Sequence, residues 1–480
     1  MGAINGENYI NRLNALNNEI WLDGEKLEGL ISEHPVFKGL IQTKASLYDL
    51  QHNPKIKDEM TFVSPLTGER VGLSYLMPKT KEDLIKRRKM MEHWARHTHG
   101  ILGRSPDYLN SVLMGFTSSA AMLEGQEKCY PENLLAFFEI VRENDLSLTH
   151  TFITPQVNRS QSYIENTNEP ISARVIAETE EGIIIKGARL LATQGGLTDE
   201  VFVFNVGKLV FGEDETFSFA VPSNTEGLKF ICRDSFIGGE SAFDHPLSSK
   251  YEEMDSIVVF DNVLVPWERV FFYNNVEVAE KFIMQSGFHH FAKSQVLIRQ
   301  IVKTEFILGI AELLINTIKV YEYQHIHEKM SEIIVGLETM KALLEKSEND
   351  AALDEYGYLR PAILPLKVAG YTFSKIYARL TEIIQLIGAS GIITLPTEKA
   401  FHSAIRSDLD QYLQAATKPA EERVKIFRLA WDLTMSSFGT RQTQYERFFF
   451  GDPVRLASEL YFNYPKKEYV EAVCKFINLK

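Results

Sequence analysis

The sequence predicts an α+β multidomain protein, in which an N-terminal helical domain, a middle antiparallel β-barrel and a C-terminal helical bundle follow one another along 480 residues. Two changes of pattern predict this order. Short β-branched and aromatic runs gather between about residues 170 and 275, whereas apolar residues at helical spacing dominate before and after them. We therefore expect domains at residues 1–146, 147–275 and 276–480.

The composition is that of an ordinary globular protein, with 45% hydrophobic and 24% charged residues. The formal net charge of −13 disfavours nucleic-acid binding, which needs a basic surface. Cys129, Cys232 and Cys474 are odd in number and far apart, so we expect no disulfide framework and a cytoplasmic location. The sequence opens with no secretory signal pattern, and no apolar run reaches the length of a membrane span, so no membrane partner is expected.

The N-terminal domain is predicted to be mainly helical. Residues from Lys81 to about His99 have apolar side chains at helical spacing, with acidic residues early and basic residues late, as the helix dipole favours. The next predicted helix is Pro106–Glu124, with Ser105 as its N-cap and proline at its first position. Pro131–Asn144 carries a third helical pattern.

The middle domain is predicted from short runs separated by Gly, Asn, Asp and Glu, which indicate a compact antiparallel barrel or sandwich. The runs are Ala173–Thr179, Gly182–Ala188, Glu200–Val206, Thr216–Val221, Leu228–Ile231 and Ser256–Phe260. Beyond about Val276 the helical pattern returns in long segments, which suggest an antiparallel bundle. These segments are Gln295–Tyr323, Lys329–Asn349, Tyr358–Gly388, Glu421–Phe438 and Tyr469–Ile477.

The stretch Ser147–Ser160 (SLTHTFITPQVNRS) joins the first two predicted domains. It places four polar side chains at a domain junction, a preferred place for a cofactor pocket. They are His150, Thr151, Gln156 and Arg159. Pro155 argues against a continuous helix, so we expect an extended segment. The alternative is a polar linker whose side chains satisfy local backbone groups.

Arg104 and Tyr108 are four residues apart, so they share a helix face if the predicted helix reaches back to Arg104. If the fold brings His150 to them, an arginine, a phenol and an imidazole can hold and activate a phenolic oxygen. The alternative is an exposed arginine beside a half-buried tyrosine.

Three further stretches present polar or small residues to a ligand. In Gly187–Glu200, Thr193 and the residues after it form a loop where a planar ligand can approach the backbone, or a plain hairpin turn. Gln385–Gly391 (QLIGASG) suits either a nucleotide or a helix C-cap. Arg441, in Ser436–Arg447, suits a phosphate, or else lies on a solvated polar loop.

Motifs for other chemistries are absent from the sequence. It has no Walker A sequence, no Rossmann GxGxxG after a strand and no GxSxG. It also has no HExxH and no Cys/His cluster, so no metal site is expected. The pair His289-His290 before the long helical segment is of a kind that is more often structural than catalytic.

Several stretches together resemble the two-component flavin hydroxylase family, that of the 4-hydroxyphenylacetate 3-monooxygenase oxygenase components. They are GRSPDYLN, THTFITPQVNRS, GARLLATQGGLTDE, MDSIVVFDNVLVPWERVF, QLIGASG and GTRQTQYERFFFGDP, and they occur in the family's order. The resemblance runs from Trp21 to Pro453. It implies the acyl-CoA dehydrogenase-like architecture, which agrees with the order of domains predicted above, and a homotetramer or a dimer.

The resemblance also implies a reaction and its participants. A separate NAD(P)H-flavin reductase supplies FADH2, O2 is the co-substrate, and a flavin C4a-hydroperoxide adds a hydroxyl group ortho to that of a phenol such as 4-hydroxyphenylacetate. It places Arg104, Tyr108 and His150 at the phenol, and Asn205 and Val206 near the substrate tail. The flavin-contacting positions it implies are His150, Thr151, Gln156, Arg159, Thr193, Asp255, Arg441 and Gln442, with Gln385, Gly388 and Gly391 meeting a neighbouring subunit's flavin.

Alternatives remain within the superfamily. His289 or His290 corresponds loosely to a base in halophenol-hydroxylating relatives, so a halophenol or a tyrosine-derived biosynthetic intermediate is an alternative substrate. A 4-hydroxybutyryl-CoA dehydratase-like lyase would need three cysteines and a histidine at one [4Fe–4S] site, and the three cysteines here are scattered. A flavin-binding protein without activity is the remaining alternative, because fold does not fix function.

Overall fold

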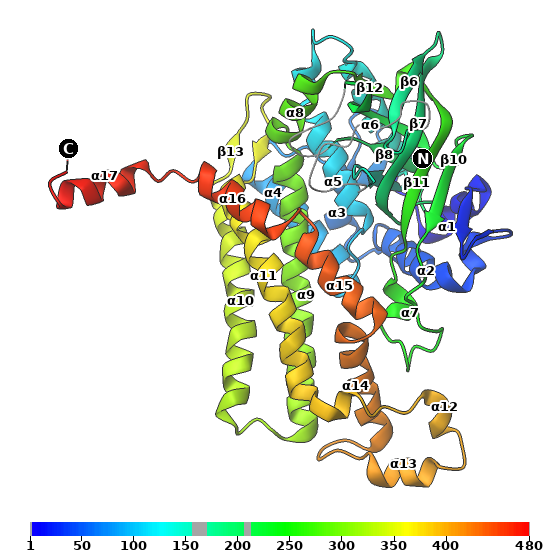
Figure 1. The fold of residues 1–480 in the computed structure, drawn as a ribbon, viewed down its shortest axis with the longest axis vertical. Helices are drawn as coiled ribbons and strands as arrows, with labels where there is room; N and C mark the ends of the chain where they lie inside the picture. The colour runs from blue at the N-terminus through cyan, green and yellow to red at the C-terminus, as the bar shows by residue number, and fades with distance from the viewer. Residues whose placement is uncertain (1, 156–169, 206–212, 480) are drawn as a thin grey trace.

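The computed structural model describes residues 2–155, 170–205 and 213–479 (Figure 1). Helices precede and follow a region of β-sheets, in the predicted order. Gln156, Arg159 and Val206, which the sequence singled out, lie outside the described residues.

The N-terminal region contains helices and two small hairpins. Its helices are α1 (Gly6–Leu16), α2 (Pro35–Leu50), α3 (Lys57–Met60), α4 (Lys81–His97), α5 (Pro106–Thr117) and α6 (Pro131–Asn144). Its strands are β1 (Ile20–Leu22), β2 (Glu25–Lys26), β3 (Thr61–Val63) and β4 (Arg70–Gly72). Thr80 and Asp83 form a capping box at the start of α4.

Helix α5 is shorter than predicted, because the chain turns at Ser118 and continues as the short 3₁₀ segment Ala120–Leu123. Ser105 precedes its first residue as predicted, but the Ser105 hydroxyl donates to Asp107 Oδ1 over 2.5 Å and makes no cap hydrogen bond. Arg104 lies in the turn before α5, so the helix does not reach back to Arg104 and the condition for a helix face shared with Tyr108 is not met.

The middle region forms open sheets, so the prediction of a closed barrel is corrected for the residues described. Its strands are β5 (Leu148–Thr151), β6 (Arg174–Glu178), β7 (Gly182–Thr193), β8 (Glu200–Val203), β9 (Phe217–Pro222), β10 (Leu228–Cys232), β11 (Asp255–Pro266) and β12 (Val270–Tyr273). A six-stranded sheet has the order β2-β1-β10-β11-β7-β6, and a four-stranded sheet has the order β12-β9-β8-β5.

Neither of these sheets is purely antiparallel. Strand β1 from the N-terminal region pairs in parallel with β10, with Ile20 opposite Phe230. Strand β5 pairs in parallel with β8, with His150 opposite Phe202. Both parallel pairs join strands that lie far apart in sequence, and the local turn signals that predicted hairpins carry no information about such pairings.

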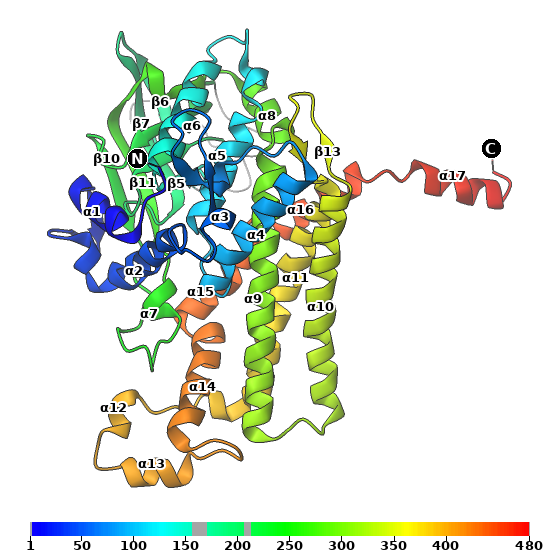
Figure 2. The same cartoon turned by 180° about the vertical axis from the view of Figure 1, so that it is seen from behind.

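Long helices α9 (Phe288–Ile318), α10 (Gln324–Asn349) and α11 (Ile363–Gly388) lie side by side along the long axis of the molecule (Figures 1 and 2). The other elements of this region are α8 (Val276–Gln285), α12 (Glu398–Phe401), α13 (Arg406–Tyr412), α14 (Ala420–Thr434), α15 (Ser437–Phe448), α16 (Pro453–Asn463), α17 (Lys467–Phe476) and the hairpin β13 (Ala352–Leu353) and β14 (Leu359–Arg360). The short helix α7 (Ser248–Tyr251) belongs to the middle region, between β10 and β11. Helix α17 projects away from the body of the molecule in both views.

A phenylalanine-rich core joins the three regions where the site lies. Phe116 of α5 stacks on Phe288 at the start of α9, with ring centroids 4.8 Å apart, and meets Phe202 of β8 edge-on at 5.7 Å. Phe204, directly after β8, packs against Phe116 at 5.2 Å. This packing fixes α5 against β5 and β8, so side chains from α5 and β5 face one another.

Candidate active site

Five buried or half-buried side chains meet between α5, β5 and α15, and we call them the Arg104 cluster. They are Arg104, Tyr108, His150, Tyr445 and Phe449. The guanidinium carbon of Arg104 lies 4.4 Å from the ring centroid of Tyr108 and 4.5 Å from that of Phe449. The rings of Tyr108 and His150 are 5.8 Å apart, edge to face. The structure therefore brings together the three residues that the sequence predicted to meet.

His150 is held with both ring nitrogens free. Its side chain is 2% exposed, and neither Nδ1 nor Nε2 has a hydrogen-bond partner among the described residues. Burial lowers the pKa of His150 well below its usual value, and the Arg104 guanidinium lowers that pKa further. The imidazole is therefore neutral near pH 7 and can accept one hydrogen bond and donate another.

The polar atoms around His150 are also unsatisfied. Arg104 Nε and Nη1 and the Tyr445 hydroxyl are buried and have no hydrogen-bond partner among the described residues. Burial raises the pKa of Tyr108, although Arg104 acts in the opposite direction, so this phenol stays protonated as a donor. Buried polar atoms are nearly always paired, and several unpaired ones in one place are the signature of a binding site for a polar group.

A second group of polar residues, which we call the Asp255 cluster, joins the two strands β7 and β11 to helix α15. Arg441 of α15 donates to both carboxylate oxygens of Asp255, over 2.9 and 2.7 Å. The Thr193 hydroxyl and Arg233 Nε donate to the same carboxylate, over 2.8 and 3.0 Å. Asp255 and Thr193 are also register partners in the sheet.

Burial disfavours the charge of Asp255, but Arg441 and the other donors outweigh burial and hold the pKa of this carboxyl far below its usual range. Arg441 Nη1 is buried and makes no hydrogen bond with the described residues. One edge of the Arg441 guanidinium is therefore fixed by Asp255, and Nη1 on the other edge, 3.7 Å from Glu253 Oε2, keeps hydrogen-bonding capacity for an anionic group. The segment around Arg441 is helix α15, not the polar loop that was the alternative.

Other predicted residues lie elsewhere or serve the fold. The Thr151 hydroxyl donates to the Leu190 carbonyl over 3.0 Å. Asn205 is 1% exposed and its amide bridges the Glu215 carbonyl and the Phe217 N–H, so its side chain supports the chain beside β9. Gln442 faces the bundle, where its Oε1 accepts from Lys303 Nζ over 2.6 Å.

Gln385 donates to the Thr434 carbonyl over 3.1 Å. Helix α11 ends at Gly388, so the segment Gln385–Gly391 contains a helix C-terminus, one of the two roles predicted for it. A side chain at Gly391 would meet the Phe427 ring at 2.8 Å, which explains why glycine stands there. These residues border an exposed apolar surface, where Leu386 and Ile393 are 50% and 71% exposed.

The two adjacent histidines lie at the start of α9. Burial, followed by the charge of Lys293, lowers the pKa of His289 to about 3, so this imidazole is neutral. His290 Nδ1 lies 2.8 Å from the Pro361 carbonyl. None of the recorded hydrogen bonds or ring contacts of the described residues joins either histidine to Arg104, Tyr108 or His150, so a role as a base at that cluster stays a prediction.

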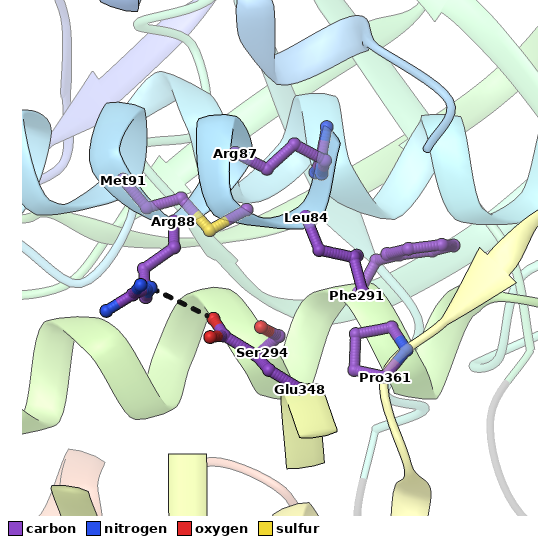
Figure 3. Close-up of a pocket in the computed structure, with 8 residues that line it drawn as sticks. All are labelled: Leu84, Arg87, Arg88, Met91, Phe291, Ser294, Glu348 and Pro361. Atoms are coloured by element: carbon purple, nitrogen blue, oxygen red, sulfur yellow. Dashed lines mark ion pairs between the residues drawn. The ribbon is translucent and has the colours of Figure 1, made fainter. Parts of the chain in front are cut away.

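Figure 3 shows a small pocket between α4 and α9. An ion pair of 3.2 Å between Arg88 and Glu348 lies at its edge. The pocket volume is about 10 Å³, which is hardly room for one water molecule. Leu84, Met91, Phe291 and Pro361 line much of it. None of the residues of the Arg104 or Asp255 clusters lines this pocket.

Comparison with known proteins decides the family. The family models for the N-terminal and C-terminal parts of 4-hydroxyphenylacetate 3-hydroxylase match residues 5–272 and 279–478. The chain belongs to the 4-hydroxyphenylacetate 3-hydroxylase family. It is 64% identical over its whole length to the probable 4-hydroxyphenylacetate 3-monooxygenase of Bacillus subtilis, and covers 99% of that protein. It is 44% identical to the oxygenase component of Thermus thermophilus, covering 99% of this chain and 97% of the relative.

Solved structures of the 4-hydroxyphenylacetate 3-hydroxylase family have the same fold. One crystal structure, of an oxygenase component complexed with FAD and 4-hydroxyphenylacetate, matches with a TM-score of 0.95 and 43% identity, covering 99% of this chain and 98% of that one. An archaeal 4-hydroxybutyryl-CoA dehydratase matches at 0.88 with 18% identity, which shows a shared fold alone. In the part of this chain that the structure describes, no three His, Cys, Asp or Glu residues gather as a metal site, and all three cysteines are free.

The Arg104 cluster and its surroundings contain residues that sequence reasoning missed. The rings of Tyr445 and Phe449 lie against Arg104, and Glu253 binds its main chain. Gln194, which the sequence placed with Thr193 on a loop suited to a planar ligand, donates to the Arg104 carbonyl. Phe449 belongs to the stretch GTRQTQYERFFFGDP that carried the resemblance, so that stretch held a signal for this ring. Glu253 is one of two adjacent acids before Met254, and nothing in its local pattern distinguishes it from a solvated residue.

Proposed function

We propose that this chain is the oxygenase component of a two-component aromatic hydroxylase that adds an ortho hydroxyl group to a phenol such as 4-hydroxyphenylacetate. Membership of the 4-hydroxyphenylacetate 3-hydroxylase family supports the proposal. The observation that carries it is the Arg104 cluster, where Arg104 and His150 have buried nitrogens without a partner among the described residues. The Tyr445 ring lies against both Arg104 and Arg441 of the Asp255 cluster.

In this proposal the phenol binds with its hydroxyl group between Arg104, Tyr108 and His150. An unperturbed phenol has a pKa of about 10, so it is almost wholly protonated at neutral pH. The positive charge of Arg104 favours the phenolate, Tyr108 donates a hydrogen bond to the oxygen, and neutral His150 accepts the phenolic proton. A phenolate ring is richer in electrons than a phenol ring and is attacked more readily by an electrophilic oxygen.

The chain's residues suit a flavin beside this phenol. Arg441 offers its free Nη1 edge to an anionic group, because Asp255 holds the other edge, and Thr193 lies on the same carboxylate. Bound reduced FAD supplies, together with O2, the oxygen atom that is transferred. Gln156 and Arg159, which the resemblance assigns to the flavin, are part of the proposal although they lie outside the described residues.

The proposal includes partners. A separate NAD(P)H-flavin reductase supplies the reduced FAD, and the chain assembles as a homotetramer, or a dimer, in the cytoplasm. The exposed apolar surface near Gln385, Gly388 and Gly391 supports contact between copies, through which these residues meet a neighbouring subunit's flavin. No helix in the described parts of the chain is long and apolar enough to cross a membrane.

The choice of 4-hydroxyphenylacetate as substrate is supported by the sequence identity between this chain and its relatives. Relatives named for 4-hydroxyphenylacetate include two at 64% and 44% identity, and two at 28% from Pseudomonas aeruginosa and Escherichia coli. A 4-nitrophenol 2-monooxygenase of Rhodococcus and the pyoverdin chromophore biosynthetic protein of Pseudomonas aeruginosa reach 30% and 29%. 4-Hydroxyphenylacetate is therefore the proposed substrate. A halophenol and a tyrosine-derived intermediate are the alternatives.

The test is a panel of phenols incubated with the purified chain, a generic flavin reductase, NADH, FAD and air. We expect 4-hydroxyphenylacetate to give a catechol that has gained one oxygen atom by mass spectrometry, faster than a halophenol or tyrosine. A reaction without the chain controls for free reduced flavin. Oxygen consumption without any hydroxylated phenol would overturn the proposed function.

A further inference from the structure

Glu253 and Gln194 hydrogen-bond the main chain of Arg104 on both sides, and we call this pair the clamp. The Glu253 carboxylate accepts the N–H of Gly103 and the N–H of Arg104, each over 2.7 Å. On the other side of the same residue, Gln194 Nε2 donates to the Arg104 carbonyl over 3.0 Å. Gln194 Nε2 also donates to Glu253 Oε1 over 3.0 Å, so the clamp is one connected unit.

The clamp is built from the strand ends that carry Thr193 and Asp255. Gln194 directly follows Thr193, and its N–H donates to the Met254 carbonyl over 2.7 Å, between Glu253 and Asp255. Glu253 Oε2 also lies 3.7 Å from Arg441 Nη1, the guanidinium nitrogen that makes no hydrogen bond. Glu253 therefore touches both the turn that carries Arg104 and the free edge of Arg441.

Glu253 is buried, so water cannot replace the hydrogen bonds that its carboxylate makes within the protein. Its side chain is 0% exposed, and a buried carboxylate needs hydrogen bonds or an opposite charge to offset the loss of water. When an anion occupies the free edge of Arg441, Glu253 shares that cation with the anion. The stability of the buried Glu253 charge then depends more on its hydrogen bonds with the Gly103 and Arg104 amides. These hydrogen bonds hold the turn that carries Arg104 more firmly.

We propose that Glu253 couples flavin binding at Arg441 to phenol binding at Arg104, so that each ligand raises the affinity for the other. The proposal rests on the proposed function, which places the two ligands at these residues. Coupling between two binding sites is reciprocal, so the factor measured for the phenol must equal the factor measured for the flavin. Glu253 is a positioning residue here, since it acts through Arg104 and Arg441.

The experiment measures binding and not turnover. The affinity of the full-length chain for 4-hydroxyphenylacetate is determined by anaerobic equilibrium dialysis, with and without saturating reduced FAD. We expect flavin to tighten phenol binding about fivefold or more in the wild-type chain, the lower range of typical coupling factors. In Glu253→Gln, each ligand still binds alone, but the factor falls to less than about twofold.

Glu200→Gln is the matched control, because Glu200 is a buried carboxylate of β8 that pairs with Arg269 at 3.1 Å and not with Arg104 or Arg441. We expect it to keep the wild-type coupling factor. Hydrogen–deuterium exchange adds a measurement that would not change if Glu253 had a purely structural role. We expect the peptide covering residues 100–105 to gain protection when reduced FAD binds to the wild-type chain, but not when it binds to Glu253→Gln.

Glu253→Asp serves if Glu253→Gln does not fold, since it keeps the charge but is one methylene too short to reach both amides. An unchanged coupling factor in the folded variant, or a wild-type factor of one, overturns the role of Glu253. Failure of the proposed function gives a different result: Arg104→Ala then binds the phenol as tightly as the wild type does at saturating flavin.

Discussion

Arg104 is fixed by its main chain and left free at its guanidinium group. Glu253 and Gln194 hold its amide and carbonyl, while three aromatic rings surround the charge without neutralising it. A guanidinium group without a carboxylate partner keeps its full charge for a ligand. Arg441 differs, because Asp255 neutralises it along one edge. In the proposal Arg104 binds the phenol and Arg441 binds the flavin.

His150→Ala tests the proposed acceptor of the phenolic proton. Because His150 accepts the phenolic proton in the proposal, its loss impairs hydroxylation more than flavin oxidation. Oxygen and reduced flavin are still consumed, but hydrogen peroxide replaces the catechol. The hydroxylation rate falls roughly 10²–10⁴-fold, the range typical of general acid–base catalysis. Stopped-flow absorbance follows flavin oxidation while the catechol is quantified separately.

His97→Ala is the control for His150→Ala, since His97 lies on α4 and contacts Ser46 at 2.8 Å. It should give wild-type catechol yields. A full catechol yield per flavin oxidised in His150→Ala, at an unchanged rate, would mean that His150 is a packing residue.

Arg441→Ala tests the arginine assigned to the flavin. Losing one charge-assisted contact costs roughly 1.5–3 kcal/mol of binding, so the variant requires more reduced FAD and is partly rescued by an excess. Anaerobic titration of reduced FAD measures the effect. Arg447→Ala, on the same helix, serves as the control. Normal flavin affinity together with weakened phenol binding would show that the assignment is wrong.

At the scale of elements, helix α15 carries both Arg441 and a buried charge group that anchors it to α9. Glu446 accepts from Arg299 over 2.6 and 3.0 Å and from Lys303 over 2.8 Å, and all three side chains are almost wholly buried. Burial opposes the charge of Glu446, but Arg299 and Lys303 outweigh it and lower the pKa to about 2. The same helix carries Tyr445, and Phe449 directly follows it, so this anchor positions both rings beside Arg104.

Glu446→Gln should destabilise the protein strongly, because it leaves two buried cations without a full counter-charge. Removing one partner of a buried ion pair costs about 3–5 kcal/mol, which differential scanning calorimetry detects. Since the folded pKa lies below the unfolded one, the contribution of Glu446 is present above pH 4.5 and is lost as the pH falls towards 2. The variant should therefore show a flatter loss of stability over that acidic range than the wild type.

Glu459→Gln is the control for Glu446→Gln, because its ion pair with Lys367 is 30% exposed on the glutamate side. An exposed pair contributes little, so a small change is expected. Equal effects of the two substitutions would contradict the anchoring role of Glu446.

The sequence predicted elements well where the signal was local. The helix from Lys81 and the helix Pro131–Asn144 appear at their predicted positions, and β5 is the extended segment expected around His150. It could not predict the open sheets, because the parallel pairs of β1 and β5 join strands from distant parts of the chain. Glu253 was missed for the same reason, since its partners Gly103 and Arg441 lie far from it in sequence.

For the molecule as a whole, the placement of the site between regions has a physical basis. Arg104 and Tyr108 come from the N-terminal region, His150 from β5 and Tyr445 from α15, so the cluster exists only when all three regions are packed. A pocket shared by several elements can be dry and rigid on all sides, which strengthens its electrostatic effects. The resemblance placed Arg104, Tyr108 and His150 together, whereas it assigned no role to Tyr445.

The pairing of β1 with β10 has a consequence for how the protein is made. Residues near Ile20 leave the ribosome roughly 200 residues before Phe230, the partner they need. At typical rates of synthesis of about 5–20 residues per second, the first hairpin waits on the order of 10–40 seconds without its sheet. During that interval its edge is open to other nascent chains. The first strand to be synthesised is thus placed late, and N-terminal fusions that slow its docking should lower the yield of folded protein in the cell.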